Sequence, residues 1–303
     1  MELVDKLSNR QYIDGEWVES SNKNTRDIIN PYNQETIFTV AEGTKEDVER
    51  AILAARRSFE DGEWSLETSE VRGKKVRAVA DKIKENREEL AKLETLDTGK
   101  TLEESYADMD DIHNVFMYFA GLADKDGGEI INSPIPNAES KVVKEPVGVV
   151  TQITPWNYPL LQASWKIAPA LATGCSLVMK PSEITPLTTI RVFELMEEVG
   201  FPKGTINLVL GAGSEVGDVM SGHEEVDLVS FTGGIETGKH IMKQAANHVT
   251  DVALELGGKN PNIIFDDADF ELAVDQALNG GYFHAGQVCS AGSRILVHND
   301  IKD

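Results

Sequence analysis

The sequence has few cysteines and no long apolar run. Its two cysteines, Cys175 and Cys289, are too few for a disulfide framework, so the composition favours a reducing compartment. No apolar stretch approaches the roughly 20 residues that cross a bilayer. The N-terminal residues MELVDKLSNRQYIDGEW lack the basic start and apolar segment of a signal peptide. These absences predict a cytoplasmic protein with no membrane partner.

Positive charge is also scarce. The chain has 29 Lys and Arg against 51 Asp and Glu, which gives a formal net charge of -22. Such a chain offers no basic stripe for phosphates, so we expect no nucleic-acid partner. The six histidines form no HExxH or paired-cysteine spacing, and no metal site is predicted.

The first part of the chain is polar, with apolar residues at helical spacing. Helical segments are expected around Thr44–Phe59, Ser69–Thr98 and Thr101–Gly121. They are followed by GGEIINSPIPNAESKVVKEPVG, in which prolines and short alternating runs are typical of an exposed β-arm.

Short apolar runs recur from Val147 onward. They are VGVVTQIT, SLVMKP, INLVL, DLVSFTGG and VALELGG, and such runs are what strands buried on both faces require. Between them, Ala163–Ala172 and Pro186–Val199 read as helices. We therefore predict an α/β fold with a doubly wound parallel sheet, whose ligands lie at the carboxyl ends of the strands.

A second α/β unit begins after Gly258. It comprises NPNIIF, a helix near Phe270–Phe283 and QVCSAGSRILVH. The expected organisation is a Rossmann-like nucleotide-binding domain over 1–126 and 146–256, a β-arm over 127–145 and the start of a catalytic domain over 257–303.

The stretch FTGGIETGKH follows a predicted strand and opens a predicted helix near Glu236. From Gly233 its spacing matches an ATP-binding P-loop, but His240 stands where Ser or Thr would ligate magnesium. Backbone N–H groups at a helix N-terminus bind anions, and Gly233 and Gly234 would let a pyrophosphate approach closely. The stretch therefore favours a dinucleotide over ATP.

Two other stretches have alternative interpretations. GAGSEVG misses the dinucleotide spacing by one residue and is either a plain glycine turn or a phosphate loop. MKPSEITP is either a turn with Ser182 capping the next helix or a ribose site. In the second case Lys180 and Glu183 could both reach ribose hydroxyls, and the carboxylate would select NAD by repelling a 2′-phosphate.

Three residues are candidates for chemistry. Cys289, in GQVCSAGSR, lies among small polar residues, unlike Cys175 in its apolar run. Glu255, in LELGGKNP, lies in an apolar strand end, where burial would raise its pKa toward that of a general base unless a cation pairs with it. Asn157, in TPWNYP, either caps a turn or donates its amide to an oxyanion.

Together, PWNYP, KPSE, FTGG with TGK, LELGGK and GQVCSAGSR resemble the aldehyde dehydrogenase superfamily in order and spacing, over essentially the whole chain. The resemblance implies an aldehyde substrate, NAD and a thiohemiacetal and thioester on Cys289. Asn157 would hold the oxyanion and Glu255 would activate water. The implied NAD contacts are Ile153, Thr154, Pro155, Trp156, Lys180, Ser182, Glu183, Gly213, Gly217, Phe231, Thr232, Gly233, Gly234, Thr237, Leu256 and Gly257.

The chain is most similar to the betaine-aldehyde dehydrogenases of that superfamily. Aromatic residues there enclose a trimethylammonium group, and Tyr158, Trp165 and Phe283 stand at these positions. Ser290 is a further expected substrate contact. Alternatively, Trp165 and Phe283 pack in the core and the substrate is an aminoaldehyde or a general aliphatic aldehyde. A non-catalytic binding protein and a P-loop ATPase remain as alternatives from other classes.

The resemblance also bears on length and assembly. Members of the superfamily continue well beyond this length, so it implies a C-terminal truncation, with residues 1–303 alone poorly folded after Gly258 and inactive. It further implies a homodimer or homotetramer in which the arm at 127–145 bridges subunits.

Overall fold

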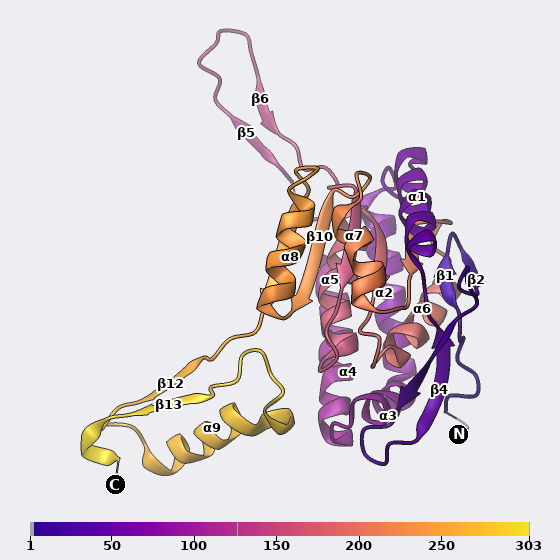
Figure 1. Ribbon diagram of the computed structural model, residues 1–303. Coiled ribbons are helices and arrows are strands. Elements are labelled where there is room, and N and C mark those ends of the chain that lie inside the picture. The colour runs from indigo at the N-terminus through magenta and orange to yellow at the C-terminus, as the bar shows by residue number, and fades with distance from the viewer. Residues whose placement is uncertain (1–2, 126, 303) are drawn as a thin grey trace.

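The computed structural model describes residues 3–125 and 127–302. At its centre lies a seven-stranded sheet of order β11-β10-β7-β8-β9-β1-β2 (Figure 1). Neighbouring strands among β7 to β11 run parallel, which confirms the predicted doubly wound α/β class. The strands are β1 (Gln11–Ile13), β2 (Glu16–Val18), β7 (Val149–Ile153), β8 (Ser176–Lys180), β9 (Ile206–Leu208), β10 (Leu228–Gly233) and β11 (Asp251–Leu256).

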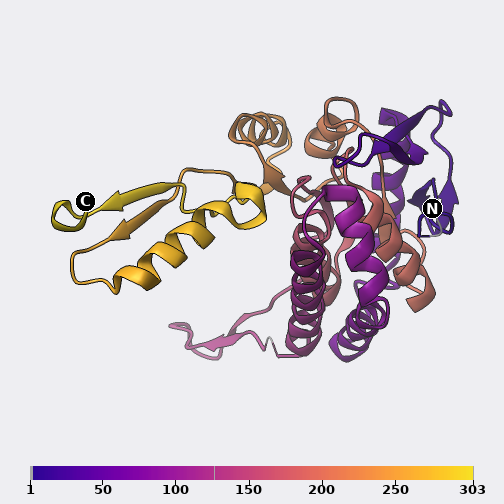
Figure 2. The ribbon, with the colours of Figure 1, turned by 90° about the horizontal axis from the view of Figure 1, so that it is seen from below.

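Helices cover both faces of this sheet, and each face has its own apolar core. Helices α1, α7 and α8 pack on one face, while α5 and α6 pack on the other with α2, α3 and α4 behind them (Figures 1 and 2). The helices are α1 (Lys45–Asp61), α2 (Ser69–Glu85), α3 (Arg87–Thr98), α4 (Leu102–Leu122), α5 (Pro159–Thr173), α6 (Leu187–Val199), α7 (Asp218–Gly222) and α8 (Ile235–Ala245).

The strand order puts a switch point at the centre of the sheet. From β7 the chain moves outward through β8 and β9, then crosses to the other side of β7 to form β10 and β11. Loops therefore diverge at the carboxyl ends of β7 and β10. In doubly wound sheets this divergence forms the crevice in which ligands bind.

Two sequence-based expectations are wrong in detail. The segment Ser69–Thr98 is two helices, because Asn86 ends α2 by donating its side-chain amide to the carbonyl of Lys82 at 2.8 Å. Strand β11 is not buried on both faces, since its residues alternate between exposed and half-buried. It forms the outer edge of the sheet, and α8 packs against it.

The N-terminal strands were not predicted. β1 and β2 form an antiparallel hairpin that extends the sheet beyond β9, and β3 (Thr25–Ile29) pairs with β4 (Thr36–Ala41) in a separate hairpin. The helices that follow start at reciprocal caps. Thr44 and Asp47 form one at α1, and Thr101 and Glu104 form one at α4.

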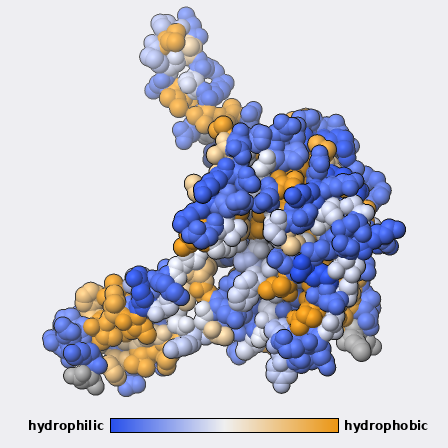
Figure 3. Space-filling model, viewed as in Figure 1, coloured by the Kyte–Doolittle hydropathy of each residue, from blue (hydrophilic) through white to orange (hydrophobic). Residues whose placement is uncertain are grey.

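Two parts of the chain extend from this body (Figure 1). β5 (Glu129–Ile131) and β6 (Ser140–Val142) form an arm whose residues are exposed, as expected for a β-arm. The C-terminal unit contains β12 (Pro261–Ile264), α9 (Phe270–Tyr282), β13 (Arg294–Val297) and short helical turns at Phe283–Gly286 and Asn299–Ile301. Figure 3 shows apolar residues on the surfaces of both parts. Among the described residues, no helix is long and apolar enough to cross a membrane.

Candidate active site

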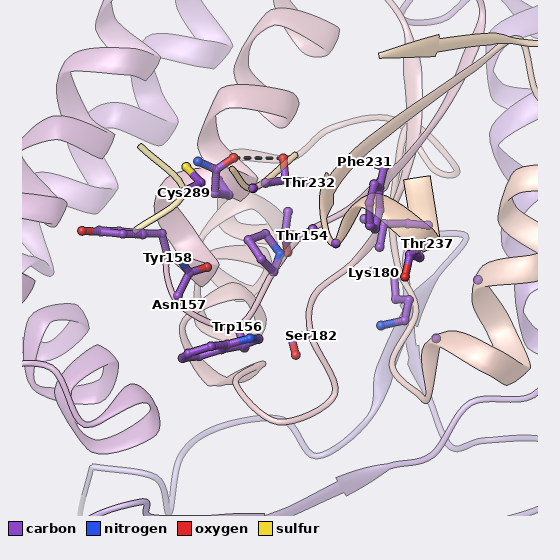
Figure 4. A pocket seen from close by; sticks show the side chains of 18 of the residues that line it. Thr154, Trp156, Asn157, Tyr158, Lys180, Ser182, Phe231, Thr232, Thr237 and Cys289 are labelled. Carbon is purple, nitrogen blue, oxygen red and sulfur yellow. Dashed lines mark hydrogen bonds between the residues drawn. The ribbon is translucent and has the colours of Figure 1, made fainter. Parts of the chain in front are cut away.

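A cavity of about 470 Å³ opens at the carboxyl ends of β7, β8 and β10. Ile153, Lys180 and Gly233, the last residues of these strands, line it. Figure 4 shows Cys289, Asn157 and Tyr158 toward one end and Lys180, Phe231 and Thr237 toward the other. All the expected NAD contacts line this cavity except Leu256, whose side chain packs beside Gly238 instead.

The start of α8 gives the cavity an anion-binding character. Gly234 is the capping residue of α8, and no side chain caps this end of the helix. A Cβ added at Gly234 would meet no atom within 4 Å, so the backbone is open to the cavity. The unpaired N–H groups and the helix dipole both favour a negative group here.

Lys180 and Glu183 form an ion pair beside α8. Nζ of Lys180 lies 3.3 Å from Oε2 of Glu183 and donates to the carbonyl of Pro181 at 2.8 Å. Burial alone would raise the pKa of Glu183, but Lys180 and a backbone N–H outweigh it, so the pKa is lowered. Glu183 therefore presents a carboxylate to the cavity at neutral pH. Ser182 does not cap a helix, because α6 begins after Pro186.

Two further features border this end of the cavity. The hydroxyl of Thr154 is buried and has no hydrogen-bond partner within the protein, although Thr154 lines the cavity. The GAGSEVG stretch forms a short helical turn at Gly213–Gly217 that also lines it. Glu42 holds this turn by accepting the N–H of Ala212 at 3.0 Å. The Thr154 hydroxyl is therefore available to a ligand.

Cys289 and Asn157 line the other end of the cavity. Cys289 is exposed, and the side-chain amide of Asn157 donates to the carbonyl of Gln287 at 2.7 Å. An amide group has two N–H donors, so one remains available to an oxyanion. The structure thus places a thiol and an amide donor around the same space, an arrangement suited to addition of sulfur to a carbonyl carbon.

The prediction that Glu255 is buried is wrong. Glu255 is exposed on the edge strand β11 and does not line the cavity. Its charge acts on Lys166, whose Nζ donates to the hydroxyl of Ser230 at 3.0 Å. Burial lowers the pKa of Lys166 to about 8, and Glu255 opposes that shift.

The structure brings only one of the three expected aromatic residues to the cavity. Tyr158 lines it, whereas Trp165 and Phe283 are 48% and 50% exposed and lie outside the lining. Neither residue is buried in the core, so the alternative that both are core packing is wrong. Ser290 is exposed and outside the lining as well.

A buried ion cluster of Lys100, Glu94 and Asp108 packs against the Tyr158 ring. Nζ of Lys100 lies 4.3 Å from the centre of the Tyr158 ring, 2.5 Å from Asp108 and 3.4 Å from Glu94. Burial, followed by the charges of Asp108 and Glu104, raises the pKa of the Tyr158 phenol. The phenol therefore stays neutral.

Several lining residues were not predicted. Gln162 accepts the hydroxyl of Thr232 at 3.0 Å, the dashed bond in Figure 4, and His240 lies 2.7 Å from Asp218. The signal for His240 was its spacing, because positions three and four residues after Thr237 share its face of α8. The unpredicted lining residues are Gln162, Asp218, His240, Ile241, Gln287 and Val288.

One group of potential metal ligands lies outside the cavity. Single ligand atoms of Asp266, His298 and Asp300 fall within 4.8 Å of one another, and all three residues are exposed. Exposed acidic groups of this kind are common without an ion, so the group does not suggest a metal centre.

Known proteins resemble this chain closely. Residues 17–303 match the aldehyde dehydrogenase family. Betaine aldehyde dehydrogenase from Bacillus subtilis (strain 168) is 66% identical over 98% of this chain and 61% of its own length. Peroxisomal aminoaldehyde dehydrogenase 1 from Pisum sativum is 46% identical over 97% of this chain and 60% of its own length.

Solved structures give the same picture. A crystal structure of betaine aldehyde dehydrogenase from Staphylococcus aureus in complex with NAD+ is 90% identical, with a TM-score of 0.99. The match covers 100% of this chain and 60% of the crystallised chain. The chain thus spans about 60% of the length of the proteins it matches.

Proposed function

The chain belongs to the aldehyde dehydrogenase family, and on that basis we propose that it oxidises betaine aldehyde to glycine betaine with NAD. The observation that carries the proposal is that Cys289 and Asn157 line the same cavity as a site suited to a dinucleotide. The relatives support the choice of substrate, since the Bacillus subtilis protein is named a betaine aldehyde dehydrogenase.

The residues of the cavity fit NAD. The unpaired hydroxyl of Thr154 and the uncapped start of α8 at Gly234 offer donors, and Glu183 offers a carboxylate for ribose hydroxyls. When bound, NAD supplies the acceptor for the hydride that leaves the substrate carbon. We assign 1–126 and 146–256 to its binding and 257–303 to the beginning of the catalytic domain.

The residues at the other end perform the covalent chemistry in this proposal. The thiolate of Cys289 adds to the aldehyde carbon, and the free N–H of the Asn157 amide and the backbone N–H of Cys289 stabilise the oxyanion. Loss of hydride leaves a thioester. Water then attacks its carbonyl carbon, Glu255 accepts the proton, and the C–S bond breaks to release the acid. Glu255 must turn toward Cys289 for this step.

A second substrate class is favoured by one observation. Of the three expected aromatic residues, only Tyr158 lines the cavity, so the aromatic enclosure of a trimethylammonium group is incomplete among the described residues. An aminoaldehyde needs less of that enclosure, and the Pisum sativum relative is named an aminoaldehyde dehydrogenase.

The test compares two aldehydes of the same shape. NADH formation by the full-length protein is followed by absorbance with betaine aldehyde and with its uncharged carbon isostere, 3,3-dimethylbutanal. A clear preference for the cation supports betaine aldehyde, and equal rates support the second class. Absence of NADH with every aldehyde, or unchanged NADH formation by Cys289→Ala, refutes the dehydrogenase itself.

Two further proposals concern the setting of the protein. The exposed arm at 127–145 carries Ile130 and Val143, which are 82% and 72% exposed. We propose that it pairs with another subunit in a homodimer or homotetramer, which sedimentation of a variant lacking the arm would test. A cytoplasmic location also stays a prediction.

A further inference from the structure

His284 has no part in the chemistry proposed above, yet its side chain is buried although the residues on either side of it are exposed. We call residues 283–289 the Cys289 loop. Within it, His284 is 4% exposed, whereas both of its neighbours and Cys289 itself are exposed. A polar ring buried in this way requires partners that satisfy its nitrogens.

His284 joins three elements that are distant in the sequence. Its Nε2 lies 3.0 Å from the backbone carbonyl oxygen of Asn157. Because a carbonyl only accepts, Nε2 carries the hydrogen. The backbone N–H of His284 donates to Oε1 of Glu104 at 2.9 Å. Its ring meets that of Tyr158 edge-on, with 5.1 Å between centres.

The contact with Asn157 is reciprocal. The side-chain amide of Asn157 donates to the backbone carbonyl of Gln287 in the Cys289 loop. In the other direction, the His284 ring donates to the backbone carbonyl of Asn157. Two bonds in opposite directions therefore connect the amide donor and the loop that bears the thiol.

The backbone at this point is strained. His284 and Ala285 have φ values of 49° and 54°, in the left-handed region. This conformation is unfavourable for a residue other than glycine and persists only when surrounding contacts hold it. The bonds of His284 to Asn157 and Glu104 are the contacts in place to do so.

The surroundings also keep the ring neutral. Burial lowers the pKa of His284, and the nearby positive charge of Lys100 lowers it further, against the opposing effects of the bond to Asn157 and of Glu104 and Asp108. The ring is therefore neutral at neutral pH, with its hydrogen on Nε2 donated to Asn157.

We propose that His284 is a positioning residue that anchors the Cys289 loop to the turn containing Asn157, and so sets where the amide donor lies relative to the thiol. The catalytic part of this inference rests on the proposed function. The positional part, the anchoring of the loop, does not depend on which reaction takes place.

Two substitutions in the full-length protein separate the hydrogen bond from the bulk of the ring. His284→Phe keeps a ring against Tyr158 but loses the donor, whereas His284→Gln keeps a donor near the position of Nε2. A misplacement of about 1 Å can cost on the order of a hundredfold in rate. We expect His284→Phe to lower kcat by about ten- to a hundredfold with the KM for NAD unchanged, and His284→Gln to restore most of the loss.

A second readout does not require turnover. Loss of one hydrogen bond should raise amide hydrogen exchange in the Cys289 loop by about tenfold in His284→Phe. The matched control is His113→Phe, because Nδ1 of His113 also lies 3.0 Å from a backbone carbonyl, that of Ala80, and both residues lie outside the cavity lining. It should change neither readout.

The outcomes are distinct. Parental kcat and parental exchange in His284→Phe would overturn the inference, as would equal losses in His284→Phe and His284→Gln. If the parent forms no NADH, the proposed function fails, and the exchange data alone decide whether His284 anchors the loop.

Discussion

The proposed nucleotide end of the cavity, at Thr154 and Lys180, is made of buried strand ends, whereas the proposed catalytic end, at Cys289, is an exposed loop. Every residue of β7 and β8 is buried, and these strands deliver Thr154 and Lys180 to the cavity. Cys289 is exposed and reaches the cavity on a loop hydrogen-bonded to the turn at Asn157. The first end is therefore determined by the packed core, and the second by a few directional bonds.

This difference predicts which changes will affect one end alone. Asn157→Ala should have the largest effect, because it removes the proposed oxyanion donor and leaves the strands intact. We expect kcat for NADH formation to fall by about a hundred- to a thousandfold, while the melting temperature and the Kd for NAD stay near the parental values.

Asn33→Ala is a suitable control for that experiment. Asn33 also donates its amide, to Glu35 at 2.7 Å, on the exposed surface. A parental kcat in Asn157→Ala, or an unfolded protein, would contradict the distinction between the two ends.

Lys166 lies on α5 behind the cavity lining, and its Nζ reaches Ser230 of β10. With its pKa lowered from 10.5 to about 8, its buried charge destabilises the fold fully below pH 8. This destabilisation disappears as the pH rises from 8 to 10.5, because Lys166 has lost its proton in the folded protein but keeps it in the unfolded chain. The free energy of unfolding gains a contribution on the order of 3 kcal/mol across this window.

Lys166→Met should remove that contribution, which urea unfolding at a series of pH values would measure. Lys74→Met, at an exposed lysine of α2, should keep the parental pH dependence. Parallel pH profiles for the parent and Lys166→Met would show that the Lys166 charge is not destabilised by burial.

Glu183→Gln should have the smallest effect and act at the nucleotide end only. Removing the carboxylate removes the repulsion of a 2′-phosphate, so the ratio of affinities for NAD and NADP should shift by about tenfold toward NADP. The kcat with NAD should hardly change. Glu198→Gln, which breaks a surface pair with Lys82, is the matched control; an unshifted ratio would remove Glu183 from cofactor selection.

The same comparison explains what the sequence could predict. The strands that end at Ile153, Lys180 and Gly233 follow from local apolar runs, and the motifs after them line one cavity as expected. The exposure of Glu255 could not be foreseen, because an apolar strand reads alike whether its far side is covered or open. The exposure of Trp165 and Phe283 could not be foreseen for a similar reason, since burial depends on neighbours and not on spacing.

His284 was missed for another reason. No pattern in YFHAGQVC indicates that the chain turns left-handed at His284 and Ala285 or that the ring is buried. Both features arise only when the Cys289 loop meets Glu104 and Asn157, residues more than a hundred positions earlier.

The missing cap of α8 has a consequence for how the protein responds to heat. Glycine at this position leaves the first turn without a side-chain partner, so the free helix frays from that end more readily than one capped by Ser or Asp. An anion bound at Gly234 would complete the turn, and by linkage the folded state gains the free energy of that binding. Bound NAD would thus cap the first turn of α8, and the melting temperature should rise with NAD concentration.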